Sequence, residues 1–149
     1  MAEVIDKDLG WKRIKSKTHF LDGKEIRAGV LWSAGKGKKG VDIAYYASCN
    51  EYGTSDGHIP SRPFMATTAD ERKMWKAPVE SAVNNIILQD AEIVSELNHV
   101  GEKMKTDIKN NIGTHKFKPL KAVTVKRKGH DIQLIDSGAL LDSIDYEVK

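Results

Sequence analysis

The glycines Gly35, Gly37 and Gly40 have the spacing of a phosphate-binding turn. They lie between a segment with the period of a strand and a segment with the period of a helix, the context that a dinucleotide-binding fingerprint requires. Backbone N–H groups at a helix N-terminus attract phosphate, and the lysines of residues 36–39 would add positive charge. However, no acidic residue ends a second strand about twenty positions later, and the Lys and Ser or Thr of a Walker motif do not follow Gly40. We therefore interpret residues 35–40 as a solvated turn and expect no nucleotide cofactor.

The histidines, the cysteine and the serines give no catalytic or metal-binding pattern. No His-Glu-x-x-His or Cys-x-x-Cys spacing occurs among the five histidines and the single cysteine. Cys49 shares an expected apolar helix face with Tyr45 and Tyr52, where we expect it to act as a small buried side chain. Ser137 lacks the Gly-x-Ser-x-Gly turn of a hydrolase nucleophile, so a helix-capping role is better supported. These residues thus give no recognisable nucleophile site, and we expect no bound metal ion.

A basic segment in the C-terminal part is the main asymmetry of charge. Residues 113–130 contain no acidic side chain and six basic ones, namely Lys116, Lys118, Lys121, Lys126, Arg127 and Lys128. Such a segment could neutralise phosphates, with an affinity that falls as the salt concentration rises. Because Phe117 is its only aromatic residue, a platform for stacking unpaired bases is poorly supported. We favour an exposed loop or a patch that faces an acidic partner, and nucleic-acid association through residues 116–128 is the alternative.

Changes of hydrophobic period predict the elements that position these residues. Residues 25–33 alternate as in a strand, with Trp32 on the apolar side. Residues 41–52 have the period of a helix, which ends at Gly53. Glycines and prolines then punctuate residues 53–62, which we expect to form a loop.

Two long helices are expected in the middle of the chain. The first begins near Pro63, or near Thr68 if the capping-box spacing there is used. Pro78 lies inside this helical pattern and should kink or break the helix. The second helix covers about residues 91–112, where apolar side chains recur every three or four positions.

The C-terminal part returns to short elements. Residues 120–125 are compatible with a strand, residues 136–138 begin a short helical turn, and residues 143–148 alternate cleanly between apolar and acidic positions. The order of strand, helices and strands predicts an α+β domain, with a small, mostly antiparallel sheet packed against long helices. We assign residues 25–149 to this single domain. We expect residues 1–24 to form an N-terminal arm or edge segment. Within it, the pattern of residues 11–20 is compatible with a weak strand or with part of the arm.

Length and composition fit one domain of a reducing compartment. A chain of 149 residues is long enough for one core without disulfides or metal. Its 24 basic and 21 acidic residues give a net charge of +3, which does not by itself require a nucleic-acid partner. A single cysteine excludes an internal disulfide. No apolar run approaches the roughly 18 residues of a membrane span, and the first residues do not resemble a signal peptide, so we expect a cytoplasmic protein without a membrane partner.

Five segments, taken in order, resemble a known protein family. They are residues 51–54 (EYGT), 59–65 (IPSRPFM), 124–129 (TVKRKG), 134–140 (LIDSGAL) and 143–148 (SIDYEV). Their order and spacing are similar to those of the small neck proteins of tailed bacteriophages, which are also called head–tail joining, tail-completion or virion morphogenesis proteins. The positions that we single out as motif or interface residues are Glu51, Tyr52, Gly53, Thr54, Ile59, Pro60, Arg62, Pro63, Phe64, Lys126, Arg127, Lys128, Asp136, Ser137, Gly138 and Tyr146.

The resemblance implies a structural subunit without enzymatic activity. Proteins of this family assemble as rings, often hexamers, between the portal-side connector and the tail. The implied partners are therefore further copies of the chain and other neck, connector and tail-tube subunits, with passive contact to DNA in the channel. The implied location is the virion neck, preceded by the host cytoplasm before assembly.

The motif loop at residues 51–64 has two alternative roles on physical grounds. Gly53 allows a backbone conformation that other residues resist, and the prolines of the loop lower the entropy lost on ordering. Arg62 offers a planar donor fork that suits a carboxylate, for which Glu51 is the nearest candidate in sequence. The loop either braces the helix junction inside one subunit or docks onto a neighbouring subunit through its aromatic residues.

The C-terminal strand is the candidate for contacts around the ring. A head-to-tail contact that repeats by rotation closes into a ring. Edge strands suit such contacts because their unpaired backbone groups can extend the sheet of a neighbour. We therefore expect residues 143–148 to take part, whereas the sequence does not decide whether the lysine-rich turn at residues 36–39 faces a partner, the solvent or the channel.

Overall fold

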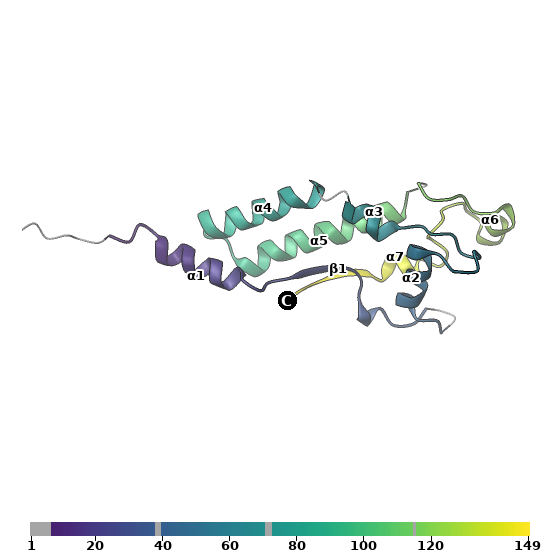
Figure 1. Ribbon diagram of the computed structural model, residues 1–149, viewed down its shortest axis with the longest axis horizontal. Helices are drawn as coiled ribbons and strands as arrows, with labels where there is room; N and C mark the ends of the chain where they lie inside the picture. The colour runs from purple at the N-terminus through teal and green to yellow at the C-terminus, as the bar shows by residue number, and fades with distance from the viewer. Residues whose placement is uncertain (1–6, 38–39, 71–72, 115) are drawn as a thin grey trace, which may run out of the picture.

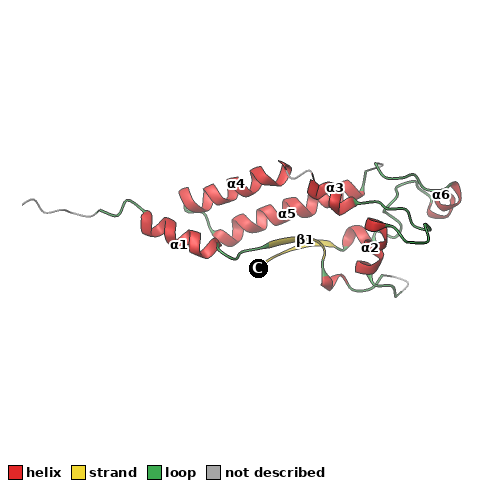
Figure 2. Cartoon of the chain, viewed as in Figure 1, coloured by secondary structure: helices red, strands yellow, loops and turns green. Residues whose placement is uncertain are grey.

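Two strands from opposite ends of the domain pair in one sheet that helices cover. The computed structural model describes residues 7–37, 40–70, 73–114 and 116–149. Strand β1 (Ile26–Val30) pairs antiparallel with strand β2 (Ile144–Val148), and Ala28 lies opposite Tyr146. Figures 1 and 2 show an elongated molecule in which helices dominate. The expected α+β class, with a small antiparallel sheet packed against long helices, is confirmed.

The long helix α5 (Ile93–Ile112) is the element on which the other elements pack. It contacts both strands and the helices α3 and α4 described below. Its amphipathic pattern explains this position, because one stripe of the helix is buried: Leu97, Val100, Gly101, Ile108 and Ile112. Gly101 allows β2 to lie close, since a Cβ atom there would stand only 2.2 Å from Cδ2 of Tyr146. The helix expected at residues 91–112 is thus confirmed.

The first expected helix is divided into α3 (Phe64–Asp70) and α4 (Lys73–Leu88). Helix α3 begins directly after Pro63, which agrees with the first of the two expected starts. The break considered at Pro78 does not occur, because α4 continues through that residue. The carbonyl that a proline there leaves without its helical partner belongs to Met74, an exposed residue, so water can satisfy it.

Helix α2 (Ile43–Tyr52) is present, but the expected buried face is wrong. The buried residues are Ile43, Ala47, Asn50 and Glu51. The tyrosines Tyr45 and Tyr52, expected on the apolar face, are 66% and 81% exposed. The pattern of apolar residues failed here because half of the buried positions are polar. These polar side chains find hydrogen-bond partners within α2 and in the first turn of the next helix, α3.

The segment at residues 11–20, expected as a weak strand or part of an arm, is not a strand, because it forms helix α1 (Trp11–Leu21). The carboxylate of Asp8 accepts hydrogen bonds from the backbone N–H groups of Gly10 and Trp11 and so starts the helix. No residue of α1 is buried. Figure 1 shows α1 extending beyond the body of the molecule at one end, in keeping with its description as an arm.

Two further expectations about local structure are corrected. Strand β1 ends at Val30, and Trp32 lies in the short 3-10 helix η1 (Trp32–Ala34) with 95% of its surface exposed. Residues 120–125 do not form a strand, because residues 122–128 form helix α6 (Ala122–Lys128). Gly129 ends α6 in a left-handed conformation, and its N–H bonds to the carbonyl of Val125. The β-branched side chains of residues 120–125 had favoured a strand.

The core lies where α3, α5, α7 (Ala139–Asp142) and β2 meet. Its largest fully buried side chains are Phe64, Ile112, Leu134 and Ile144, while Ile86 of α4 is fully buried outside this cluster. The short helix expected after residues 136–138 is confirmed as α7. Within the described ranges, no helix combines the length and the apolar character that crossing a membrane requires.

Candidate functional site

The carboxylate of Glu51 ties the end of α2 to the start of α3. Its Oε2 accepts the N–H of Met65 at 2.9 Å, and its Oε1 accepts the N–H of Ala66 at 2.8 Å. These N–H groups belong to the first turn of α3, where no helical carbonyl is available to them. A negative charge is also favourable at this end of a helix. Because Glu51 is only 6% exposed, the two hydrogen bonds satisfy a carboxylate that solvent scarcely reaches.

Arg62 does not pair with Glu51, which corrects the expected ion pair. Its Nη1 donates to Oδ1 of Asn50 at 3.3 Å, and its backbone N–H donates to the carbonyl of Asn50 at 2.7 Å. Arg62 is only 7% exposed, and burial lowers the pKa of its guanidinium below the ordinary value. Arg62 therefore does bind helix α2, but its partner there is the side-chain amide of Asn50 instead of the carboxylate of Glu51.

The loop between the two helices is held by its own hydrogen bonds. The N–H of Thr54 donates to the carbonyl of Ile59 at 2.9 Å. The carboxylate of Asp56 accepts from the hydroxyl of Thr54 at 2.6 Å and from the N–H of His58 at 2.9 Å, and these hydrogen bonds lower the pKa of Asp56. Gly53 has φ 78°, and a Cβ atom there would meet the N atom of Ser61 at 2.9 Å. These contacts support the internal brace, the first of the two roles expected for the loop.

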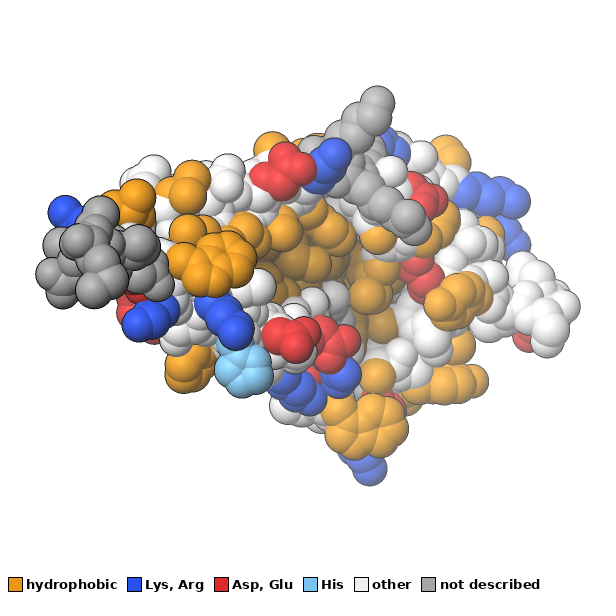
Figure 3. All heavy atoms as spheres, turned by 60° about the vertical axis from the view of Figure 1, so that its left-hand side comes forward, with side chains coloured by type: hydrophobic (Ala, Val, Ile, Leu, Met, Phe, Trp, Pro, Cys, Tyr) orange, Lys and Arg blue, Asp and Glu red, His pale blue; other side chains and the backbone are white. Residues whose placement is uncertain are grey.

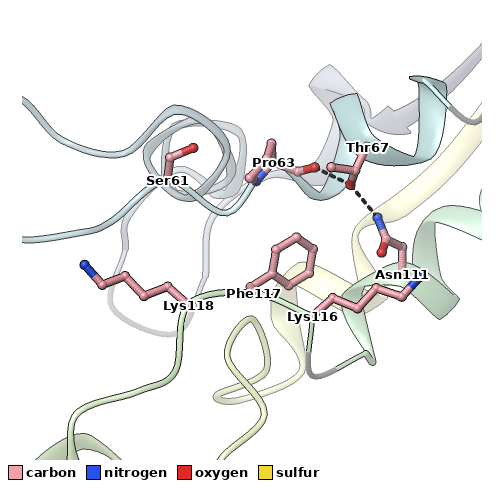
Figure 4. Close-up of a pocket in the computed structure, with 7 residues that line it drawn as sticks. All are labelled: Ser61, Pro63, Thr67, Asn111, Lys116, Phe117 and Lys118. Carbon is pink, nitrogen blue, oxygen red and sulfur yellow. Dashed lines mark hydrogen bonds between the residues drawn. The ribbon is translucent and has the colours of Figure 1, made fainter.

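A pocket of about 360 Å³ lies where the motif loop meets the basic segment (Figure 4). Its lining residues come from the loop, from α3 and α5 and from the start of the basic segment: Ser61, Pro63, Thr67, Asn111, Lys116, Phe117 and Lys118. The structure thus brings together two regions that the sequence indicated separately. The sequence did not predict three of the pocket residues, Ser61, Thr67 and Asn111. For Asn111, the only sign in the sequence is that it is a polar residue beside the apolar stripe of α5.

The basic segment does not form one continuous face. Lys116 and Lys118 line the pocket, whereas Lys126 and Arg127 are exposed on α6. Lys128 turns toward its own chain, where its Nζ donates to the carbonyl of Ile132 at 2.8 Å. Burial lowers the pKa of Lys128, since an ammonium group loses hydration there. Only part of the segment is therefore available to an outside partner.

The motif residues near the C-terminus have structural positions. Gly138, with φ 82°, is the N-cap residue directly before α7, and Ser137 only accepts a long hydrogen bond of 3.5 Å from the N–H of Ala139. The expected capping by Ser137 is therefore weak. Tyr146 packs against α5, and the ammonium of Lys105 lies 5.7 Å from the centre of its ring.

In the described residues next to the glycine turn at residues 35–40, an acidic side chain occupies the helix end that a phosphate would need. The carboxylate of Asp42 accepts from the N–H of Ala44 at 2.9 Å and so places a negative charge at the N-terminus of α2. A phosphate at this helix end would be repelled. Lys38 and Lys39 lie outside the described residues. The described part of the chain also holds no cluster of three His, Cys, Asp or Glu side chains that could bind a metal ion, and Cys49 is half-buried.

A second hollow, here called the apolar groove, opens between α1, β1, α4 and α5. It has a volume of about 530 Å³, and its apolar lining includes Ile26, Trp75, Val79, Leu97 and Met104. Figure 3 shows this face as a depression lined by hydrophobic side chains with charged side chains around it. The sequence predicted apolar stripes on both helices but not that part of these stripes would stay uncovered.

Comparison of the chain with protein-family models, with curated proteins and with solved structures finds no match.

Proposed function

We propose that the chain is a structural subunit of the neck of a tailed bacteriophage, which forms a ring and completes the connector or the tail so that head and tail join. The observation that carries this proposal is the amount of large apolar surface that one subunit leaves uncovered. Trp32 and Tyr52 are almost fully exposed, and the apolar groove is open. Aromatic side chains dominate the centres of interfaces, and monomeric proteins rarely leave large contiguous apolar patches in water.

The placement of these surfaces suits a ring made of copies of this chain. The apolar groove lies at the start of β1, near Ile26, whereas Trp32 lies just beyond the other end of that strand. A contact between two such different surfaces is head-to-tail, and its repetition by rotation closes a ring. Among the described residues, each strand of the two-stranded sheet also keeps one edge without a strand partner, so β2 remains our candidate for a further contact.

The ordered motif segments support the neck assignment over other assemblies. The motif loop forms a self-braced junction of two helices, and nothing in its chemistry requires a substrate. The proposed partners are other neck, connector and tail-tube subunits, and the proposed location is the virion neck. The proposed role requires no enzymatic activity.

Imaging of phage particles tests the proposal. In cells that carry a disrupted copy of the gene, we expect DNA-filled heads and separate tails to accumulate. Expression of the intact chain in the same cells should restore joined particles. Complete particles in the absence of the chain would contradict the proposal.

Nucleic-acid association through residues 116–128 is the second candidate function. The observation that favours it is the exposure of Lys116, Lys118, Lys126 and Arg127 in a segment without acidic residues. Binding of this kind weakens steeply with salt and requires no oligomer. For a neck subunit, by contrast, the distinguishing result is that heads and tails stay unjoined when the gene is disrupted.

A further inference from the structure

We propose that the pocket between the motif loop and residues 116–118 binds one unpaired nucleotide within a single-stranded nucleic acid. The base lies against Phe117, and the two phosphates that adjoin this nucleotide lie near Lys116 and Lys118. This inference goes beyond the proposed neck function, because a ring that joins head and tail needs no site for an unpaired base. It gives the second candidate function, nucleic-acid association through residues 116–128, a defined site. It depends only on the residues that line the pocket.

The apolar part of the pocket consists of two rings. Figure 4 shows the ring of Phe117 directed toward Pro63, which lies across the pocket from it. Phe117 also packs partly against the core, so its ring is fixed before any ligand arrives. Bases stack on aromatic side chains without regard to sequence, because every base has a flat π-face. The volume of about 360 Å³ lies within the range of pockets that hold small organic groups.

The charged groups flank this apolar part. In Figure 4 the two lysine side chains extend to opposite sides of the Phe117 ring, Lys118 on the side of Ser61 and Lys116 on the side of Asn111. The described residues that line the pocket include no carboxylate. A nucleoside inside a strand carries one phosphate on its 5′ side and another on its 3′ side. Two cations on opposite sides of a stacking ring therefore match an internal nucleotide better than a free mononucleotide.

The remaining polar groups offer acceptors to the edge of a base. The Nδ2 of Asn111 donates to the hydroxyl of Thr67 at 2.8 Å and to the carbonyl of Phe64 at 2.9 Å, which fixes the orientation of the amide. The Oδ1 of Asn111 is thus the atom left for a ligand. The hydroxyl of Ser61 donates to the carbonyl of Glu51 at 2.7 Å, so its oxygen also acts as an acceptor. A base with an N–H group at its edge, such as thymine, suits this lining.

Fluorescence anisotropy with a labelled oligothymidylate tests the proposal, with the full-length chain and a salt titration. The variant Phe117→Leu keeps an apolar side chain against the core but removes the stacking surface. We expect it to lower affinity by about 5- to 150-fold, the range for loss of one stacked base, without changing the salt dependence. The double variant Lys116→Ala/Lys118→Ala should reduce the slope of log K against log salt by about 1.4, since two phosphates lose their cations.

The matched control is Lys126→Ala/Arg127→Ala, which removes two charges of the same basic segment outside the pocket. We expect this control to change affinity by less than about twofold. Equal effects of the two double variants would show a diffuse electrostatic surface and would overturn the proposal. Should Phe117→Leu unfold the chain, the lysine variants still decide the question because both side chains are exposed.

Competition with small ligands separates a strand from a free nucleotide. Thymidine 3′,5′-bisphosphate carries both phosphates and should displace the oligonucleotide at lower concentration than thymidine 5′-monophosphate. Equal competition by the two would contradict the role of two flanking phosphates. Binding of a duplex as tight as that of the single strand, or no binding at low salt, would overturn the proposal, and neither result bears on the assembly of the neck.

Discussion

Glu51 shows how one residue of the motif acts differently from its expected role. The sequence placed it near Arg62 and suggested an ion pair. In the structure the carboxylate instead bridges two N–H groups in the first turn of α3, while Arg62 reaches Asn50. A glutamate can fill this position because its side chain spans the gap from the last turn of α2 to the start of α3. The motif loop therefore fixes the orientation of α3 relative to α2.

Glu51→Gln should destabilise the fold. The variant keeps one carbonyl oxygen but turns an N–H₂ group toward a backbone N–H of α3, so one buried donor loses its partner. Such a loss costs about 1–3 kcal/mol in the free energy of unfolding. Urea denaturation at neutral pH measures this difference. The control Glu80→Gln removes an exposed carboxylate that pairs with Lys76, and it should change stability by less than about 0.5 kcal/mol. A stability equal to that of the unchanged chain would show that Glu51 is not a cap.

The roles of single residues were predictable only where neighbouring residues in the chain determine them. The stop at Gly53 follows from the positive φ that its position needs. Phe64, expected as an aromatic anchor for a neighbouring subunit, is instead fully buried in the core. The hydrogen bonds of Asn111 to Phe64 and Thr67 were not predictable, since 47 and 44 positions separate these partners in the chain. An asparagine on a long helix has many potential partners, and only the packing of α3 on α5 selects among them.

At the scale of elements, the close approach of α5 and β2 depends on a helical glycine. Gly101 lies on the buried stripe of α5, opposite the ring of Tyr146. Glycine weakens a helix by about 1 kcal/mol relative to alanine, so its presence here needs a compensating reason. The reason is space, because a Cβ atom would stand 2.2 Å from a rigid aromatic ring.

Gly101→Ala should therefore destabilise the fold despite the better helix propensity of alanine. We expect a loss of about 1–3 kcal/mol, the usual cost of overpacking a core. Thermal and urea unfolding measure it. A double-mutant cycle with Tyr146→Ala isolates the cause, since alanine at position 101 should cost less once the ring is gone. Stabilisation by Gly101→Ala in the unchanged background would show that β2 does not lie this close to α5.

Removal of residues 1–21 should leave the rest of the chain folded. No residue of α1 is buried, and in its ion pair between Lys17 and Asp90 the carboxylate partner remains exposed. We expect the shortened chain to unfold cooperatively, with a free energy of unfolding within about 1 kcal/mol of the full chain. Loss of the cooperative transition would contradict the assignment of residues 1–24 to an arm and of residues 25–149 to the domain.

Elements with a strong and simple period were predictable, and elements at the surface were not. Helix α5 and the strands β1 and β2 follow from their repeats of apolar residues. Helix α6 was missed because β-branched residues favour strands, whereas in the described part of the chain the only sheet is the β1–β2 pair, which does not include this segment. The buried face of α2 was missed because polar side chains fill half of it.

At the scale of the whole molecule, the test of assembly must spare the fold. Deletion of the C-terminal strand would remove the only partner that β1 has among the described residues, together with the buried Ile144. Such a chain would unfold, and the loss of rings would then say nothing about interfaces. A substitution at a fully exposed anchor is a sharper test.

Trp32→Ser meets this condition. Trp32 is 95% exposed in one subunit, so its replacement should change the free energy of unfolding by less than about 0.5 kcal/mol. If Trp32 is an anchor in the contact between neighbouring subunits, its removal should cost at least about 2 kcal/mol per contact, as at other interface hot spots. Because a closed ring repeats the contact around its circumference, we expect the variant to fold normally and yet to give unjoined heads and tails in complementation of a disrupted copy.

Val123→Ser is the matched control, since it removes an exposed apolar side chain from α6, at a distance in sequence from both β1 and the apolar groove. We expect this variant to restore joined particles as well as the unchanged chain does. Stability measured on both purified variants separates a folding defect from an assembly defect. Joined particles with Trp32→Ser would exclude Trp32 as the anchor, and a failure of both variants would point to the total apolar surface instead of one defined contact.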